Sequence, residues 1–276
     1  MMKNDLKRED VRLLENRVNE QLGRLQMTNQ ILRENVFRIL QKETTFIQYP
    51  IEDNELCAFV CRKQGQLFSY INSYIPKDKQ IFAAAHELYH IWYEPARLEQ
   101  VEILNNDTLE YEPTVKSEKM ANRFAAMLLV PEMVLRQQVR LLNINETNIQ
   151  LSDIVQLMPI FQVPYKTIVR RLQELGYFGS KECTVFLETP DRDAATGVLL
   201  QMKVLQLSLD SQTRSKVVML DGFVEKVLLA YKDGLISYNE LREFLALANQ
   251  SPSSFGLPEM TDDDYAMLLE ACDDDD

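Results

Sequence analysis

Two histidines, His86 and His90, constrain the fold of this chain more than any other feature of its sequence. They lie four residues apart in the segment HELYH, within a stretch from about Asp78 to Tyr93 whose apolar pattern predicts a helix. Four residues advance an α-helix by about 6 Å and turn it by about 400°, so both imidazoles project from the same face. The chain has two histidines in all, so its entire histidine content lies where it can share one metal ion.

The pattern HExxH is typical of a zinc site. Two imidazoles on one helix face can bind a tetrahedral Zn²⁺, each through a nitrogen at about 2.0–2.1 Å. Glu87 follows the first histidine and would lie beside the metal, where it can take a proton from water and pass it to a leaving amine. The alternative is two ordinary helical histidines that fall four apart by chance. We favour zinc because no other histidine in the chain competes for it.

A catalytic zinc needs a third protein ligand and one open position. Because no histidine is left and no cysteine is suitably placed, we expect a carboxylate. The best candidate is Glu118, 28 residues after His90, at the start of the buried face of a helix predicted over Ser117 to Val130, with Ser117 as its N-cap. A buried carboxylate needs a strong partner, and a metal is one. Alone, Glu118 would be interpreted as a first-turn acid favoured by the helix dipole. The competing carboxylates are Glu110, Glu112 and Glu132.

Two motifs together resemble a known family. FAAAHELYH followed by EKMANRFAAMLLVP is similar to the ImmA/IrrE family of zinc metallopeptidases, in which an HExxH helix precedes a helix of the form ExxANxFAxxLLxP. The resemblance covers about residues 40–178. It implies that His86, His90 and Glu118 bind zinc and that Glu87 is the general base. The further matching positions are Ala121, Asn122, Phe124, Ala125, Leu128, Leu129 and Pro131, and Val130 stands where Met is more usual.

The resemblance also implies a substrate class. Members of the family typically act in bacteria or their mobile elements and cleave, or relieve repression by, a partner transcription factor with a helix-turn-helix domain. We therefore expect a zinc-dependent endopeptidase that makes one site-specific cut in such a repressor or antitoxin. The alternatives are a module that binds the regulator without cutting it and a hydrolase of a non-peptide substrate. Tyr89 and Tyr93 either orient substrate or have a role in the core or at the rim of the site, and the core or rim role is the favoured one.

The expected fold class is α+β and predominantly helical. It combines a zincin-like metallopeptidase core, a small and largely antiparallel sheet, the HExxH helix and further helices behind it. Strands are predicted for the segments rich in β-branched and aromatic residues, with a hairpin turn at Lys63-Gln64-Gly65; they are Thr44 to Ile51, Leu56 to Arg62 and Gln66 to Ile75. Residues 97–116 look irregular. Besides the two helices already described, helices are predicted over 8–27, 29–42, 132–142, 149–160, 164–175 and 217–232, and a capping box at Ser237–Glu240 opens one more, to about Ala248.

The region after the two motifs is harder to interpret. Residues 149–176 have the pattern of a helix-turn-helix, with Lys166, Arg170 and Arg171 on the second helix. Three charges make a small phosphate footprint, so we favour a scaffold helix pair over DNA binding. Residues 184–187 and 197–207 are strands or short helices. The expected organisation is N-terminal helices over 1–43, the metallopeptidase core over 44–145, the helix-turn-helix-like segment over 146–180, a regulatory or docking domain over 181–250 and a flexible acidic tail over 251–276.

Charge and cysteine content narrow the setting. The net charge is −12, but residues 1–178 carry 22 Lys and Arg against 23 Asp and Glu. Most of the excess negative charge therefore lies after residue 178. A solvated acidic end is the favoured interpretation, with a basic partner surface as the alternative, and direct binding to nucleic acid is not expected. No run of about 18 apolar residues predicts a membrane span. The four cysteines form no CxxC pair, and we expect a cytoplasmic location and buried, unligated Cys57 and Cys61.

Overall fold

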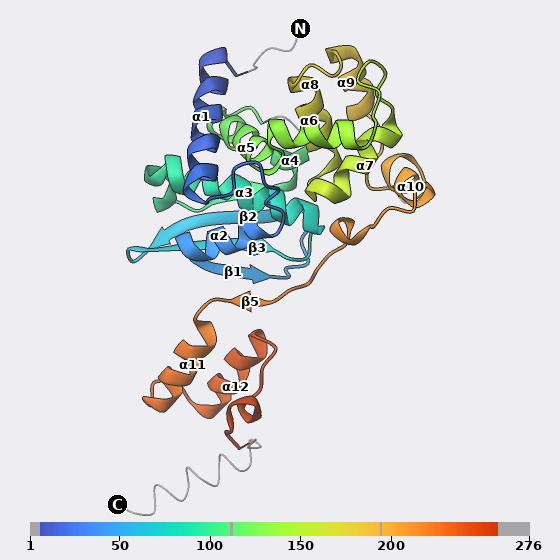
Figure 1. Cartoon of the computed structure of the whole chain (residues 1–276). Coiled ribbons are helices and arrows are strands. Elements are labelled where there is room, and N and C mark those ends of the chain that lie inside the picture. Colours follow the sequence, from blue (N-terminus) through green and yellow to red (C-terminus); the bar gives the residue numbers. More distant parts are fainter. Residues whose placement is uncertain (1–5, 111–112, 194, 259–276) are drawn as a thin grey trace, which may run out of the picture.

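A five-stranded mixed sheet forms one layer of the protein. The computed structural model describes residues 6–110, 113–193 and 195–258 (Figure 1). The strand order is β4-β2-β3-β1-β5. Neighbouring strands are antiparallel except β1 and β3, which run parallel. The fold class is α+β and mainly helical, as predicted, and the parallel pair makes the sheet mixed. The strands are β1 (Thr45–Tyr49), β2 (Leu56–Lys63), β3 (Gln66–Asn72), β4 (Glu102–Asn105) and β5 (Met219–Leu220).

The predicted hairpin joins β2 to β3. Gln64 and Gly65 both have positive φ, of 52° and 76°. Two such residues give the turn twist that matches the right-handed twist of the two strands. The hairpin prediction is therefore confirmed. Two strands fall where none was predicted: β4 lies in the segment expected to be irregular, and β5 lies at the start of the helix predicted over 217–232.

The two histidines lie on the central helix of the molecule. Helix α3 (Lys77–Tyr93) packs against β2 and β3 on one side and against α5 (Lys116–Leu129) on another. Its alanines Ala83, Ala84 and Ala85 are fully buried, so the helix can approach its neighbours closely. Two N-terminal helices, α1 (Arg8–Arg24) and α2 (Asn35–Glu43), pack on α5 and α3 respectively. The helix predicted over 29–42 begins later because Asn29 and Arg33 adopt positive φ.

The helices after α5 extend the same apolar core. Arg171, on α8 of the helix-turn-helix-like segment, is buried; its guanidinium donates to the Val130 carbonyl and to Glu174. The side chains of Cys183, Val198 and Met202 belong to the main core. The core thus continues past residue 180, where we expected a new domain to begin. The helices are α6 (Glu132–Leu141), α7 (Leu151–Phe161), α8 (Tyr165–Glu174), α9 (Ser180–Leu187) and α10 (Gly197–Val204); the shorter elements are η1 (Pro95–Glu99), α4 (Asn106–Glu110) and η2 (Asp210–Gln212).

An extended segment then crosses the start of α3 and ends in β5. The Thr213 carbonyl accepts from the Lys77 amide at 2.9 Å, and the Lys216 amide donates to the Ser73 carbonyl at 3.1 Å. The buried Gln80 side chain lies 3.2 Å from the Ser215 hydroxyl. We call residues 213–220 the strap. It fixes the C-terminal part of the chain to the beginning of the helix that carries both histidines.

The last described helices form a separate unit. Helix α11 (Phe223–Lys232) and helix α12 (Tyr238–Leu247), followed by η3 (Pro252–Phe255), enclose a small core of their own. They lie beyond β5, away from the helices that cover the sheet (Figure 1). The Ser237–Glu240 capping box is confirmed. The acidic residues 259–276, including Cys272, lie outside the described residues. Within the described chain, no helix is long and apolar enough to cross a membrane.

Candidate metal site

The two histidines and Glu118 meet in the interior. His86 and His90 are buried on α3, and Glu118 reaches them from the first turn of α5. The His86 Nε2 atom lies 3.0 Å from Glu118 Oε2 and 3.1 Å from His90 Nε2, and His90 Nε2 lies 3.7 Å from Glu118 Oε1. One ligand atom from each residue lies within 4.8 Å of the others. The structure thus brings together the three residues that the sequence predicted.

These distances fit a single metal ion. At bond lengths of about 2.0–2.1 Å, two ligands of a tetrahedral zinc are about 3.3 Å apart. The separations of His86 Nε2 from Glu118 Oε2 and from His90 Nε2, 3.0 and 3.1 Å, lie close to that value, and His90 Nε2 lies 3.7 Å from the other carboxylate oxygen, Oε1. Among the described residues no other group of His, Cys, Asp and Glu has such an arrangement. Glu132 pairs instead with Arg136 on α6, at 2.8 Å, while Glu112 and the side chain of Glu110 lie outside the described part.

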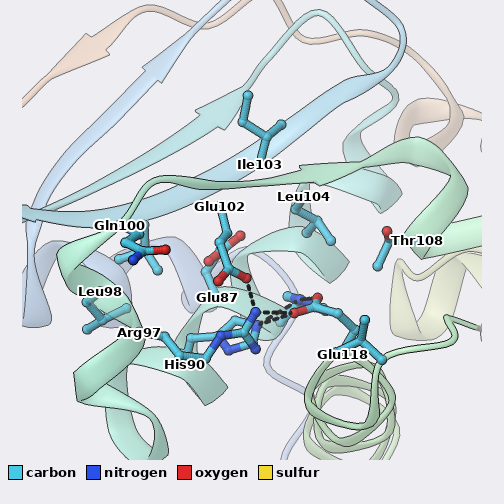
Figure 2. A pocket seen from close by; sticks show the side chains of 13 residues that line it. Glu87, His90, Arg97, Leu98, Gln100, Glu102, Ile103, Leu104, Thr108 and Glu118 are labelled. Carbon is cyan, nitrogen blue, oxygen red and sulfur yellow. Dashed lines mark hydrogen bonds and ion pairs between the residues drawn. The ribbon is translucent and has the colours of Figure 1, made fainter.

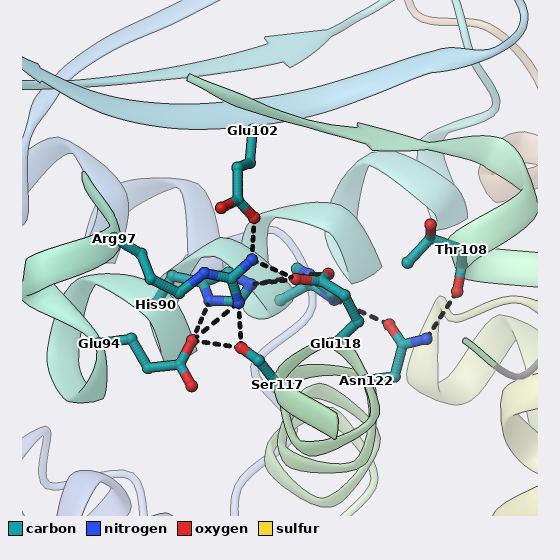
Figure 3. A network of polar contacts seen from close by, with 9 residues as sticks. His90, Glu94, Arg97, Glu102, Thr108, Ser117, Glu118 and Asn122 are labelled. Atoms are coloured by element: carbon teal, nitrogen blue, oxygen red, sulfur yellow. Dashed lines mark hydrogen bonds and ion pairs between the residues drawn. The ribbon is translucent and has the colours of Figure 1, made fainter. Parts of the chain in front are cut away.

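Each histidine has a fixed partner on its other ring nitrogen. His86 Nδ1 lies 2.8 Å from Asn122 Oδ1, and His90 Nδ1 lies 2.8 Å from Glu94 Oε2 (Figure 3). Both oxygens accept, so both Nδ1 atoms carry protons and the Nε2 atoms are left for a metal. The sequence indicates Asn122 only as a motif residue, and we predicted no role for Glu94. The i,i+4 spacing of Glu94 from His90 on a helix end is the signal that could have found it.

A cationic side chain lies among these carboxylates. The Arg97 guanidinium, from η1, donates to Glu118 Oε1 at 3.0 Å and to Glu94 Oε2 at 3.1 Å, and it also contacts Glu102 and Ser117. The Ser117 hydroxyl donates to Glu94. We predicted Ser117 as the N-cap of α5, and this prediction is wrong. The helix begins at Lys116, so its N-cap is Val115.

Burial and charge shift the pKa values of the site in opposite directions. Burial raises the pKa of Glu87 to about 7 and lowers the pKa of His86. Burial would also lower the pKa of His90, but its hydrogen bonds to Glu118 and Glu94 outweigh this and raise it to about 9. Despite burial, hydrogen bonds from His86 and His90 hold the pKa of Glu118 well below its usual range. The metal-free cluster thus favours an ionised Glu118 beside a protonated His90.

The ligands face a pocket under the edge of the sheet. His86, Glu87, His90 and Glu118 form one wall, and Figure 2 shows strand β4 running across from them. The strand is the last of the sheet, and among the described strands it pairs with β2 alone. Its backbone on the other side is therefore available to an extended chain. Apolar lining comes from Val60, Leu98, Ile103, Leu104 and Val115.

Tyr89 and Tyr93 point away from this pocket. Arg17 of α1 donates to the Tyr89 hydroxyl at 3.1 Å, and Gln21 donates to the Tyr93 hydroxyl at 2.9 Å. Both rings pack against the buried Phe124 of α5. Neither tyrosine lines the pocket. The favoured expectation of a core role is confirmed for both, and they fix α1 to the back of the metal site.

A buried HExxH helix joined by a carboxylate from a following helix defines a metallopeptidase-type site. The comparison with protein families agrees: residues 40–173 match the family model of the M78 peptidases, described as the IrrE N-terminal-like domain. This part of the chain belongs to that family, and the resemblance to ImmA/IrrE proteins is confirmed. The family points to a metallopeptidase. A search of curated proteins gave no match.

Proposed function

We propose that this chain is a zinc-dependent endopeptidase that makes a site-specific cut in a partner helix-turn-helix repressor or antitoxin and so relieves repression. The observation that carries the proposal is the meeting of His86, His90 and Glu118 with Glu87 buried beside them. The substrate class follows from the family resemblance. The cellular setting that goes with it is the cytoplasm, where reduced cysteines such as Cys57, Cys61 and Cys183 are expected.

Zinc is the metal that this donor set favours. Two imidazole nitrogens and one carboxylate oxygen are the ligands of many catalytic zinc sites, which leave a fourth position for water or substrate. When bound, zinc would supply a Lewis acid that polarises the substrate carbonyl and makes water more acidic. His86 and His90 would hold it through Nε2, and Glu118 through a carboxylate oxygen.

Glu87 would carry the protons. Its carboxylate would take a proton from the attacking water and then deliver it to the nitrogen of the leaving amine. Burial raises its pKa to about 7, so it can both accept and release a proton near neutral pH. This dual role requires that Glu87 remain close to the metal without binding it, and its place beside His86 on α3 provides that.

The pocket suits an extended protein segment. A peptide that adds to the free edge of β4 would gain main-chain hydrogen bonds and lie across the ligands. The apolar residues around the site, such as Leu98, Ile103 and Val115, would contact its side chains. A folded domain cannot enter in this way, so the cut is expected in a mobile linker of the regulator.

The test is a variant at the base. Glu87→Gln should bind zinc as the wild type does but leave a candidate helix-turn-helix regulator uncut in mass spectra. Glu99→Gln is the matched control, because Glu99 is an exposed acid near the site that pairs with Arg62 and does not line the pocket. It should cleave normally. Full cleavage by Glu87→Gln would sink the mechanism, and an intact regulator in a stable complex with the wild type would favour a binding module.

A further inference from the structure

Arg97 lies where three parts of the site converge. It belongs to η1, directly after α3, and its guanidinium projects over the ligands (Figure 3). One terminal nitrogen lies 3.0 Å from Glu118 Oε1, and the other lies 3.1 Å from Glu94 Oε2. Among the described residues that line the pocket, Arg97 is the single lysine or arginine. Its contacts therefore decide how the negative charges around the metal are arranged.

The contact with Glu118 fixes the rotation of that carboxylate. Glu118 Oε2 faces His86 Nε2 at 3.0 Å, while Oε1 faces the Arg97 guanidinium. With one oxygen held by arginine, the other is directed at the metal position. Charge-assisted bonds of this kind are shorter and stronger than neutral ones, so they restrict the side chain effectively.

Through Glu94, Arg97 is linked indirectly to His90. Glu94 Oε2 accepts from His90 Nδ1, from the Ser117 hydroxyl and from Arg97. A planar guanidinium can hold Glu118 and Glu94 at once through different nitrogens, which a lysine ammonium on a flexible stem cannot do as well. Arg97 thus acts on one ligand directly and on the other through its partner.

A further contact of Arg97 is with a residue outside the metal ligands and their partners. Arg97 also pairs with Glu102, which lies on the edge strand β4. Since β4 forms the opposite wall of the pocket, this ion pair joins the strand to the ligands (Figure 2). Arg97 is 27% exposed and Glu102 is 53% exposed. Solvent-exposed ion pairs add little to folding stability. The main effect of this pair is therefore to hold strand β4 in position relative to the ligands.

We propose that Arg97 is a positioning residue that sets the metal ligands for zinc and couples the metal centre to the edge strand. The inference rests on the zinc site of the proposed function. It assigns Arg97 no contact with the reacting atoms. Its effect passes through Glu118, Glu94 and Glu102.

Zinc affinity tests the first half of the inference. Competition with a chromophoric chelator measures the dissociation constant of zinc in the full chain. Arg97→Gln should weaken binding about 10–100-fold, the usual cost of removing a partner of metal ligands, and Arg97→Lys should fall between it and the wild type. Arg62→Gln is the matched control, since Arg62 pairs with Glu99 of the same η1 segment and touches no ligand. It should bind zinc like the wild type.

Each other result has a definite meaning. Unchanged affinity in Arg97→Gln, or an equal loss in Arg62→Gln, would overturn the inference and leave the proposed function standing. A wild type that binds no zinc would overturn both. If Arg97→Gln does not fold, the zinc affinity of Arg97→Lys is the test. Wild-type affinity in Arg97→Lys would then overturn the inference that the guanidinium positions the ligands.

Hydrogen exchange tests the coupling to the strand. Zinc loading of the wild type should slow amide exchange in the peptide that contains residues 102–105. Glu102→Gln should lose this slowing; because coupling between two sites is reciprocal, it should also weaken zinc binding, but by less than Arg97→Gln does. Equal slowing in the variant would show that Arg97 does not transmit metal binding to β4. A purely structural role for Arg97 would not produce metal-dependent protection.

Discussion

Asn122 fixes the tautomer of His86. Its Nδ2 donates to the Thr108 carbonyl at 2.6 Å, so its Oδ1 must face the imidazole, and it accepts from His86 Nδ1 at 2.8 Å. The proton is thereby held on Nδ1, and Nε2 is left with a lone pair for a metal. A motif residue of α5 thus prepares a ligand that lies on α3.

Asn122→Ala should therefore weaken zinc binding about 10–100-fold, because His86 would lose the group that selects its tautomer. Chelator competition measures the change. Asn148→Ala, an exchange of the same kind in the turn before α7, serves as the control and should have no effect. Wild-type affinity in Asn122→Ala would show that the imidazole does not depend on this hydrogen bond.

Zinc binding should release protons. In the metal-free protein the pKa of His90 is raised to about 9, so this ligand is protonated at pH 7 and must lose its proton to bind zinc. Glu87, with a pKa of about 7, is half protonated there and should lose up to half a proton beside the cation. We expect release of about 1–1.5 protons at pH 7, falling toward zero above pH 9. Apparent affinity should rise with pH over the same range.

Titration calorimetry in two buffers of different ionisation enthalpy gives the number of protons directly. The same experiment on Glu87→Gln provides the comparison, since this variant keeps all three ligands and should release about one proton, from His90 alone. Absence of release by the wild type at pH 7 would contradict the assignment of a charged His90 in the metal-free site.

Tyr89→Phe should affect stability and leave cleavage unchanged. The variant loses the hydrogen bond from Arg17 to the Tyr89 hydroxyl, which is worth about 0.5–1.5 kcal/mol, and it keeps the ring that packs on Phe124. Chemical denaturation and a cleavage assay measure the two effects separately. A tenfold loss of kcat at unchanged stability would revive the idea that Tyr89 orients substrate.

Deletion of the α11–α12 unit should be tolerated by the metal site. A chain ending at residue 221 keeps the main core and β5, whereas a chain ending at residue 180 loses Cys183, Val198 and Met202 from that core together with the strap. We expect zinc binding and a cooperative thermal transition from the longer piece, and aggregation or loss of cooperativity from the shorter one. Equal behaviour of the two pieces would mean that α9, α10 and the strap contribute nothing to the core.

The sequence predicted those parts of the site that depend on local periodicity. His86 and His90 follow from the pitch of one helix, and Glu118 follows from the buried face of another. Glu94 was missed although its i,i+4 spacing from His90 is a local signal. Arg97 was missed because its role depends on how η1 folds back over α3, which no periodic pattern records. The predicted N-cap at Ser117 failed for the same reason, since its hydroxyl donates to Glu94 in the junction between α3 and η1.

Among the strands, too, some could be predicted from local sequence and others depend on the assembled fold. The β2–β3 hairpin is encoded in its turn residues and was found, while β4 and β5 have only four and two residues. Such short strands carry too little alternation to be distinguished from loops. They exist because the edges of β2 and β1 offer unpaired backbone groups, which is a property of the assembled sheet. The parallel pairing of β1 with β3 is equally a result of assembly.

The strap also bears on the order of synthesis. Among the described strands, β5 is the last to leave the ribosome, yet it pairs with β1, the first of them, and the strap that leads to it crosses the start of the helix that carries both histidines. While residues 213–220 are still inside the ribosome, β1 is an open sheet edge and the beginning of α3 lacks its covering segment. A nascent chain therefore reaches its finished peptidase geometry late, only after residues 213–220 have left the ribosome.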